Sequence, residues 1–270
     1  MVLAVVGSHM DLDLADNTAL VTASSSGLGF ASARALADEG CNVAICGRAR
    51  ERLESAREDL ADVATGEVIA VRADITDPDD VSDLVSRTVD ECGGLDHVVT
   101  AAGNPPSTTF LETDERDWYR AYDQLVMSVV WTIEEAHAGL LESDYGTITC
   151  LASRTVREVA DDNLLSNSVC RSVIGLVKTV SREFAPEIRA NAVLPGTIET
   201  PRIEDLVEAG IERGAYDEYE DGLADLASDV PMERVGEPSE LGDVVAFLSS
   251  PRSSFVNGAA VPVDGGSLRS

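Results

Sequence analysis

Seven short apolar runs, separated by stretches with helical spacing, constrain the fold of this chain more than any other feature. The runs have the length of buried strands and cover 18–23, 42–46, 67–71, 95–100, 147–151, 189–193 and 259–263. Parallel strands need a crossover segment, usually a helix, and such helices cover both faces of the sheet. The alternation therefore predicts an α/β fold with a doubly wound, seven-stranded parallel sheet flanked by helices.

The chain is expected to form one domain. Its 270 residues, 44% of them hydrophobic, stay within the roughly 250–300 residues that one core supports. We interpret residues 1–10 as the remnant of an expression tag, because the apolar run 2–6 is too short for a signal peptide or a membrane span and residues 7–10 are typical of a vector scar. The domain then covers 11–270. Its least regular part, 200–235, is rich in Asp, Glu and Gly and is either a substrate lid or a solvated acidic insertion.

The charge of the chain indicates a salt-rich cytoplasm. The formal net charge is −29, from 49 acidic and 20 basic residues, and Lys178 is the single lysine. At 1 M salt the Debye length is about 3 Å, so repulsion between the acidic side chains is largely screened. The composition therefore favours a halophilic protein. A protein that binds basic partners would carry its acidic residues in blocks, whereas here they are distributed, and the charge disfavours nucleic acid as a partner. The five cysteines are scattered without a C-x-x-C pair, which predicts reduced thiols and no metal site.

A glycine-containing turn follows the first run and leads into a helix. It reads Thr22-Ala23-Ser24-Ser25-Ser26-Gly27-Leu28-Gly29. Such a turn presents backbone N–H groups and the positive end of a helix dipole to a pyrophosphate, and its glycines let the backbone approach the ligand closely. Alanine at the second position costs little unless the backbone there needs a positive φ. The turn predicts a dinucleotide site at the carboxyl end of the first strand.

Further motifs follow in the order found in one known family. They are Asp74 after the third run, Thr100-Ala101-Ala102-Gly103, the 146–153 segment, Pro195-Gly196-Thr197-Ile198-Glu199-Thr200 and Val263-Asp264-Gly265-Gly266. On these motifs the chain resembles the short-chain dehydrogenase/reductase family over its whole length, and its charge is similar to that of haloarchaeal proteins. The resemblance implies a single-domain Rossmann fold and a homodimer or homotetramer packed through two long helices, 115–141 and 167–184. The cofactor-binding residues that it implies are Thr22, Ser24, Ser25, Ser26, Gly27, Leu28, Gly29, Arg48, Asp74, Ile75, Ala101, Ala102, Gly103, Pro195, Gly196, Ile198 and Thr200.

The end of the second run bears on cofactor preference. An acidic residue there would accept the ribose hydroxyls of NAD, whereas an arginine can pair with the 2′-phosphate of NADP. The run ends in Cys46-Gly47-Arg48, so no carboxylate opposes a phosphate. Arg48, helped by the hydroxyls of Ser25 and Ser26, favours NADP(H). NAD stays an alternative, because Arg48 can also be an ordinary surface arginine.

The resemblance also implies four catalytic positions, and three of them carry a different residue here. The family uses a serine, a tyrosine, a lysine four residues later and an asparagine on an earlier helix. The charge of the lysine lowers the tyrosine pKa so that the tyrosine can transfer a proton. Ser153 is retained, and the family's usual spacing places Ser166 at the tyrosine position, Cys170 at the lysine position and Leu125 at the asparagine position. A serine is too weak an acid and a thiol carries no positive charge, so ordinary family catalysis is not expected.

Other side chains are candidates to take over the roles of the family's tyrosine and lysine. Lys178 lies eight helical positions beyond Cys170, about 12 Å along the axis, and cannot take over its role. Arginine can polarise a carbonyl or hold an anionic substrate, although a surface salt-bridge role is the simpler interpretation; the candidates are Arg154, Arg157, Arg171 and Arg202. Tyr119 and Tyr122 are expected to pack rather than to catalyse. His137 lies on a long helix that the family uses for dimer packing, and His97 opens the fourth strand at the edge away from the cofactor, so neither histidine is expected to act as a base.

Two functions therefore stay open. The first is an NADP(H)-binding oxidoreductase for a small carbonyl or alcohol, with Ser153 orienting the oxygen and a rebuilt proton route. The second is a catalytically silent nucleotide-binding protein with a regulatory or scaffold role. The family-like cofactor turn favours use of the nucleotide under both hypotheses.

Overall fold

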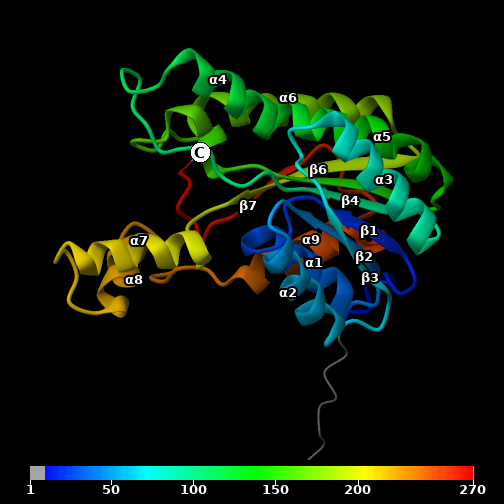
Figure 1. The fold of residues 1–270 in the computed structure, drawn as a ribbon, viewed down its shortest axis with the longest axis horizontal. Helices are drawn as coiled ribbons and strands as arrows, with labels where there is room; N and C mark the ends of the chain where they lie inside the picture. Colours follow the sequence, from blue (N-terminus) through cyan, green and yellow to red (C-terminus); the bar gives the residue numbers. More distant parts are fainter. Residues whose placement is uncertain (1–9, 270) are drawn as a thin grey trace, which may run out of the picture.

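Seven parallel strands form the central sheet of the protein, which the computed structural model describes over residues 10–269 (Figure 1). The strands are β1 (Thr18–Val21), β2 (Asn42–Gly47), β3 (Val68–Arg72), β4 (His97–Thr100), β5 (Gly146–Leu151), β6 (Ile188–Pro195) and β7 (Ala260–Val263). Their order is β3-β2-β1-β4-β5-β6-β7, and every pairing is parallel. The predicted fold class is confirmed. Most of the proposed tag lies outside the described residues.

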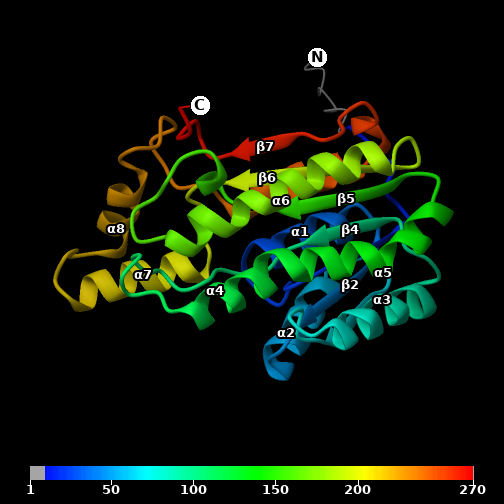
Figure 2. The same ribbon diagram turned by 90° about the horizontal axis from the view of Figure 1, so that it is seen from above.

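Helices cover both faces of the sheet (Figure 2). One face carries α1 (Gly27–Asp38), α2 (Arg50–Ala61) and α9 (Pro238–Ser249); the other carries α3 (Pro78–Cys92), α4 (Glu115–Tyr122), α5 (Ser128–Glu142) and α6 (Leu164–Glu183). Leu36, Leu53 and Leu241 pack into one buried core, while Leu84 and Val129 belong to the core on the opposite face. Within residues 10–269, no helix has the length and apolar character needed to cross a membrane.

The topology creates a crevice at one edge of the sheet. The chain builds β1, β2 and β3 outward in one direction and then returns to place β4 beside β1. The connections that leave β1 and β4 therefore diverge to opposite faces of the sheet. Ligands of open α/β sheets bind at this switch point, outside the carboxyl ends of the strands.

The first predicted long helix is interrupted in the structure. The segment expected as one helix over 115–141 consists of α4, a π-helical turn at Asp123–Met127, and α5. A π turn accommodates one extra residue and rotates the side chains that follow it, and such turns are common at functional sites. The second predicted helix, 167–184, begins earlier, at Leu164.

The acidic segment 200–235 contains a helical hairpin rather than an irregular loop. Its helices are α7 (Pro201–Glu212) and α8 (Tyr219–Ala227), which extend away from the sheet in Figure 1. A Cβ at Gly210 would lie 2.5 Å from the ring of Tyr216, and one at Gly222 would lie 2.5 Å from Val207. The two glycines thus allow the hairpin to pack on itself, which composition alone does not reveal.

A buried histidine, His97, lies at the amino end of β4, at the edge of the sheet opposite the carboxyl ends of the strands. His97 is fully buried; its Nε2 lies 2.9 Å from the side-chain amide nitrogen of Asn17, and its Nδ1 lies 2.9 Å from Thr147 Oγ1. Burial lowers the pKa of His97 from 6.5 to about 4; the neighbouring Asp96 opposes this shift and Arg189 adds to it. The folded protein therefore favours the neutral imidazole.

We expect His97 to make stability fall as the solution becomes acidic. Its pKa is lower in the folded than in the unfolded state, so its contribution is complete above about pH 6.5 and is lost as the pH falls toward about 4. At 1.36 kcal/mol per pKa unit, the loss is roughly 2–3 kcal/mol. Denaturant unfolding at pH 7 and pH 4.5 should show a smaller acid loss for His97→Gln than for the wild type. An equal loss in both proteins, with His137→Gln as control, would assign the acid sensitivity to other groups.

Candidate functional site

The predicted site residues gather at the carboxyl edge of the sheet. The cofactor turn follows β1, the Ala101–Gly103 segment follows β4, Ser153 follows β5, and the Gly196–Thr200 segment follows β6. These strands are neighbours in the sheet, so segments far apart in the sequence end at one crevice.

The cofactor turn has the backbone geometry of an anion-binding turn. Ser26 is the N-cap of α1 and its hydroxyl makes no capping hydrogen bond, while the first N–H groups of the helix have no intrahelical partner. Gly27 has φ +60°, and a Cβ at Gly29 would lie 2.6 Å from the carbonyl oxygen of Ala23. The two glycines are thus required by the backbone. Together these groups can face a pyrophosphate.

Ala23 adopts an unfavourable backbone conformation in this turn. Its φ is +46°, in the left-handed region, which is the condition under which alanine was expected to be unfavourable. A residue with a Cβ pays about 1–2 kcal/mol in that conformation. The turn therefore keeps the shape of a glycine-containing turn despite the alanine, because the contacts around it impose the conformation.

The side chains of two predicted cofactor residues connect neighbouring strand ends. Thr22 Oγ1 donates to the carbonyl of Ala101 at 2.7 Å and accepts its N–H at 2.9 Å. Ser24 Oγ donates to the carbonyl of Val21 at 2.6 Å and accepts the N–H of Cys46 at 3.0 Å. Both side chains are buried. Their hydroxyl groups are engaged with the backbone and shape the turn from within, so a cofactor contact at these two positions, which stays a prediction, would use the main chain.

The end of β2 places Ser25, Gly47 and Arg48 together. A Cβ at Gly47 would lie 2.9 Å from Ser25 Oγ, so an acidic side chain could enter there only if Ser25 moved. The Arg48 side chain is 78% exposed, and its Nη1 lies 4.0 Å from Asp74 Oδ2. Arg48 is therefore free to turn toward a ligand at Ser25.

Asp74 is held as a carboxylate beside Arg48. Partial burial acts to raise the pKa of Asp74, but hydrogen bonds from Thr76 and the charge of Arg48 outweigh it, so the pKa is lowered. The Thr76 hydroxyl and N–H donate to Asp74 Oδ1 at 2.7 and 3.1 Å. An ionised carboxylate can accept hydrogen bonds from a base, which suits the adenine contact that the family resemblance implies.

The other cofactor positions lie at the ends of neighbouring strands. Gly103 has φ +68°, and a Cβ at Gly196 would lie 2.6 Å from the Cα of Asp264. Thr200 is the N-cap of α7, and Ile198 pairs with Gly236 in an isolated bridge. The remaining predicted cofactor residues at these ends are Leu28, Ile75, Ala101, Ala102 and Pro195.

A cavity of about 40 Å³ brings all four family catalytic positions together. Ser153 follows β5, Leu125 comes from the π-helical turn, and Ser166 and Cys170 lie one turn apart on α6. The four residues identified by the family's spacing along the sequence thus line the same cavity. The remaining lining residues are Thr100, Ala102, Gly103, Asn104, Pro105, Val129, Leu151, Ala152 and Val173.

The cavity offers a hydrogen-bond donor but no cation. Ser153 Oγ accepts hydrogen bonds from the N–H and the hydroxyl of Thr155, at 3.2 and 3.0 Å, which leaves its own proton available to a substrate oxygen. Burial raises the pKa of the Cys170 thiol to about 11, although a hydrogen bond with Ser166 acts in the opposite direction. The thiol is neutral near pH 7. No lysine or arginine lines the cavity.

The basic side chains considered as replacements lie elsewhere. Lys178 Nζ donates to the carbonyl of Gly258 at 2.9 Å, away from the cavity. Arg157 donates to the carbonyl of Ala260, and Arg202, at the start of α7, donates to Ser107 Oγ at 3.1 Å. Arg154 is half-buried next to Ser153 and Arg171 is exposed.

The aromatic residues on α4 differ from their expected role. Tyr119 and Tyr122 are 64% and 46% exposed, so neither is packed in the core, and neither lines the cavity. His137 packs against Phe184, with ring centroids 4.4 Å apart. In the described part of the chain, no group of three His, Cys, Asp or Glu residues is placed to hold a metal ion.

Gln124 is a site residue that sequence reasoning missed. Its side-chain amide donates to the carbonyl of Ala102 at 2.6 Å. The bond links the π-helical turn, which carries Leu125, to the segment after β4 that lines the cavity. Only the π turn brings Gln124 to this carbonyl, and no pattern in the sequence indicates that turn.

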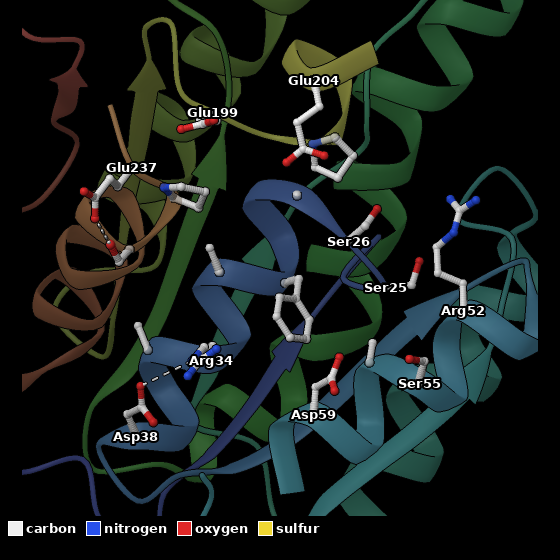
Figure 3. A pocket seen from close by; sticks show the side chains of 18 of the residues that line it. Ser25, Ser26, Arg34, Asp38, Arg52, Ser55, Asp59, Glu199, Glu204 and Glu237 are labelled. Carbon is white, nitrogen blue, oxygen red and sulfur yellow. Dashed lines mark hydrogen bonds and ion pairs between the residues drawn. The ribbon is translucent and has the colours of Figure 1, made fainter. Parts of the chain in front are cut away.

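A larger groove of about 680 Å³ runs along the outer side of α1 (Figure 3). It begins at Ser25, Ser26 and Gly27 and does not reach the catalytic positions. The other lining residues, from α1, α2, α7, α9 and adjoining turns, are Phe30, Ala31, Arg34, Ala35, Asp38, Arg52, Ser55, Ala56, Asp59, Glu199, Pro201, Glu204, Glu237, Pro238, Ser239 and Asp243. The groove touches the cofactor site at one end only.

Comparisons with known proteins agree with this geometry. The family model described as enoyl-(acyl carrier protein) reductase matches residues 22–267. Glucose 1-dehydrogenase of Gluconobacter oxydans is 32% identical over 249 residues, which cover 92% of this chain and 90% of that protein. L-sorbose reductase of Gluconobacter frateurii, solved with NADPH and L-sorbose, matches with a TM-score of 0.92 at 28% identity and covers 97% of this chain and 100% of its own. A short chain oxidoreductase of Pseudomonas aeruginosa, described as containing an atypical catalytic center, matches with a TM-score of 0.89 at 28% identity, over 96% of this chain and 99% of its own.

Proposed function

The chain belongs to the short-chain dehydrogenase/reductase family, and on that premise we propose that it is an NADP(H)-dependent oxidoreductase for a small carbonyl or alcohol substrate. In this proposal Ser153 holds the reacting oxygen, and the proton route does not use the tyrosine and lysine of the family. The observation that carries the proposal is the placement of Ser153, whose Oγ accepts two hydrogen bonds from Thr155, in a cavity that Ala102 and Gly103 of the predicted cofactor site also line.

The residues at the end of β2 support NADP(H) over NAD(H). Gly47 leaves no carboxylate near the ribose, and Ser25 occupies the space that an acidic side chain would need. Arg48 is exposed beside it and can form charge-assisted hydrogen bonds with a 2′-phosphate. The L-sorbose reductase to which the chain is similar binds NADPH, which agrees with this preference.

The chemistry at Ser153 follows from its hydrogen bonds. When bound, the nicotinamide supplies or accepts the hydride. Because Ser153 Oγ already accepts two hydrogen bonds from Thr155, its proton is directed to the substrate oxygen, which it orients and polarises. Ser166 and the neutral Cys170 do not provide a strong acid. In reduction, water that enters the crevice supplies the proton for that oxygen.

Sugars and sugar acids are the substrate class we favour. Two similar proteins are named for glucose and L-sorbose, both small polyhydroxy compounds. The half-buried Arg154 follows Ser153 directly, and Arg202 lies at the start of α7, so a carboxylate on the substrate could be held from either side of the crevice. The α7–α8 hairpin would then act as the lid.

A catalytically silent nucleotide-binding protein is the second candidate. The observation that favours it is the cavity itself, which has a serine and a buried neutral thiol where the family has its acid and its cation. Loss of a general acid alone typically costs about 10²–10⁴ in rate. Under this hypothesis the protein would bind the nucleotide for sensing or assembly.

Calorimetric titration of NADPH and NADH into the protein in concentrated KCl tests the proposal, together with a turnover screen on aldoses, ketoses and sugar acids. Tight NADPH binding, weaker NADH binding and turnover of one of these compounds are expected. NADPH binding without turnover would favour the silent protein, and binding of neither nucleotide would rule out both candidates.

The proposed setting follows from charge and family. We infer a salt-rich cytoplasm for the 11–270 domain, because the 49 acidic residues outnumber the 20 basic ones and are distributed along the chain. A homodimer or homotetramer packed through α5 and α6 is the assembly we expect.

A further inference from the structure

The groove along α1 begins where the cofactor turn meets the first turn of α2. At this end, which we call the groove head, lie Ser25 and Ser26 of the turn and Arg52 and Ser55 of α2 (Figure 3). Further along α1 the walls carry carboxylates, among them Asp59. Glu204 of α7 also lines the groove, and Arg34 further along α1 is paired with Asp38, so the two serines of the turn and Arg52 form the part of the groove that suits an anion.

Arg52 has no charge partner within the described residues. Other arginines nearby are paired: Arg34 with Asp38 and Arg57 with Glu54. Arg52 and its neighbour Arg50 take part in none of the six ion pairs formed between residues 10 and 269. The Arg52 side chain is also exposed, so no neighbouring carboxylate holds its guanidinium. Its charge is thus available to a ligand.

Ser25 connects the groove head to Arg48. Its Oγ lies against Gly47, at 2.9 Å from where a Cβ would be, and Gly47 is followed directly by Arg48. The same serine lines the groove with Arg52. A phosphate bound at Ser25 would therefore lie between two arginines that come from different elements, the end of β2 and the first turn of α2.

We propose that Arg52 is a second arginine that selects for NADP(H), holding the 2′-phosphate from the groove side while Arg48 holds it from the side of Asp74. This inference rests on the proposed function and extends it to a residue on α2. Arginine suits such shared contacts because its planar guanidinium presents several N–H donors to phosphate oxygens.

The experiment compares Arg52→Ala with Arg50→Ala, which removes the same charge from the same helical turn but does not line the groove. Affinities are measured by calorimetry for 2′,5′-ADP and for 5′-AMP, so that the readout needs no turnover. We expect Arg52→Ala to weaken 2′,5′-ADP about five- to tenfold, a reduced effect because the residue is exposed. Arg50→Ala should change it less than twofold, and 5′-AMP should be unaffected by either variant.

Several outcomes overturn the inference. If Arg52→Ala and Arg50→Ala weaken 2′,5′-ADP equally, only the general positive charge of α2 matters. If the wild type prefers 2′,5′-ADP and Arg48→Ala removes that preference while Arg52→Ala does not, the role of Arg52 is refuted and the cofactor proposal stands. If the wild type does not distinguish the two nucleotides, both fail. Partial recovery of 2′,5′-ADP affinity in Arg52→Lys, with unchanged melting curves for all variants, would support the direct contact.

Discussion

Replacement of Ser166 by tyrosine and of Cys170 by lysine in one variant is expected to raise NADPH-dependent turnover by about 10²–10⁴, the usual contribution of a general acid. The two positions lie one turn apart on α6 and line the cavity that contains Ser153. A lysine at 170 would lower the pKa of a tyrosine at 166, so activity should also gain a basic limb in its pH profile. Steady-state kcat against pH, on the compound found by the screen, checks both effects.

A control variant of similar size distinguishes a gain from proton transfer from a gain caused by filling the cavity. The cavity of about 40 Å³ is smaller than a phenol ring, so the new side chain must extend into the open crevice. Ser166→Phe with Cys170→Met adds similar bulk without an acid or a charge, and it should show no gain. Ser153→Ala in the restored protein should remove the gain while leaving NADPH affinity intact. No increase in a folded, NADPH-binding restored variant would show that the cavity is not the place of chemistry.

Arg48→Ala is expected to raise the dissociation constant of NADPH by about 10–100-fold, the equivalent of roughly 1.5–3 kcal/mol for a charge-assisted hydrogen bond. NADH affinity should change less than twofold, because NADH has no 2′-phosphate. The loss of Arg48 also leaves the Asp74 carboxylate without its cation 4.0 Å away, which adds repulsion toward the phosphate. Calorimetric titration of both nucleotides into wild type and variant checks the prediction.

Arg50→Ala is the control for Arg48→Ala, since it removes one positive charge near the same strand end without altering the β2 terminus. A comparable fall in the affinities for NADPH and NADH would indicate that Arg48 supports the fold of the site rather than the phosphate. An unchanged NADPH affinity would refute its assigned role.

The four catalytic positions implied by the family resemblance could be predicted from the sequence, because residue spacing within one helix fixes which side chains lie on the same face. Ser166 and Cys170 lie on one uninterrupted helix, so once the spacing from Ser153 places Ser166, the four-residue step along the helix brings Cys170 to the same cavity. Leu125, which the family spacing also implies, lines the same cavity although its turn is π-helical.

Side-chain roles within a motif were harder to predict than the motif. Thr22 and Ser24 belong to the cofactor turn, but their hydroxyls bond to the strand ends beside them and not to the crevice. A motif predicts which residues lie near a ligand. The distances between neighbouring strand ends determine which of their side chains bond to the backbone of the protein. Ala23 is a further example, because residue identity alone does not reveal its φ of +46°.

The sequence by itself determined the parallel sheet and the turn after its first strand, because hydrophobic periodicity and residue identity are local properties of the chain; the absence of the family's tyrosine and lysine stays a prediction from spacing. The tertiary structure alone decided the π-helical turn with its Gln124 contact, the packing of α7 on α8, and the position of Arg52 at the groove head. Each of these depends on contacts between different elements of the chain, and such contacts do not appear as a local pattern in the sequence.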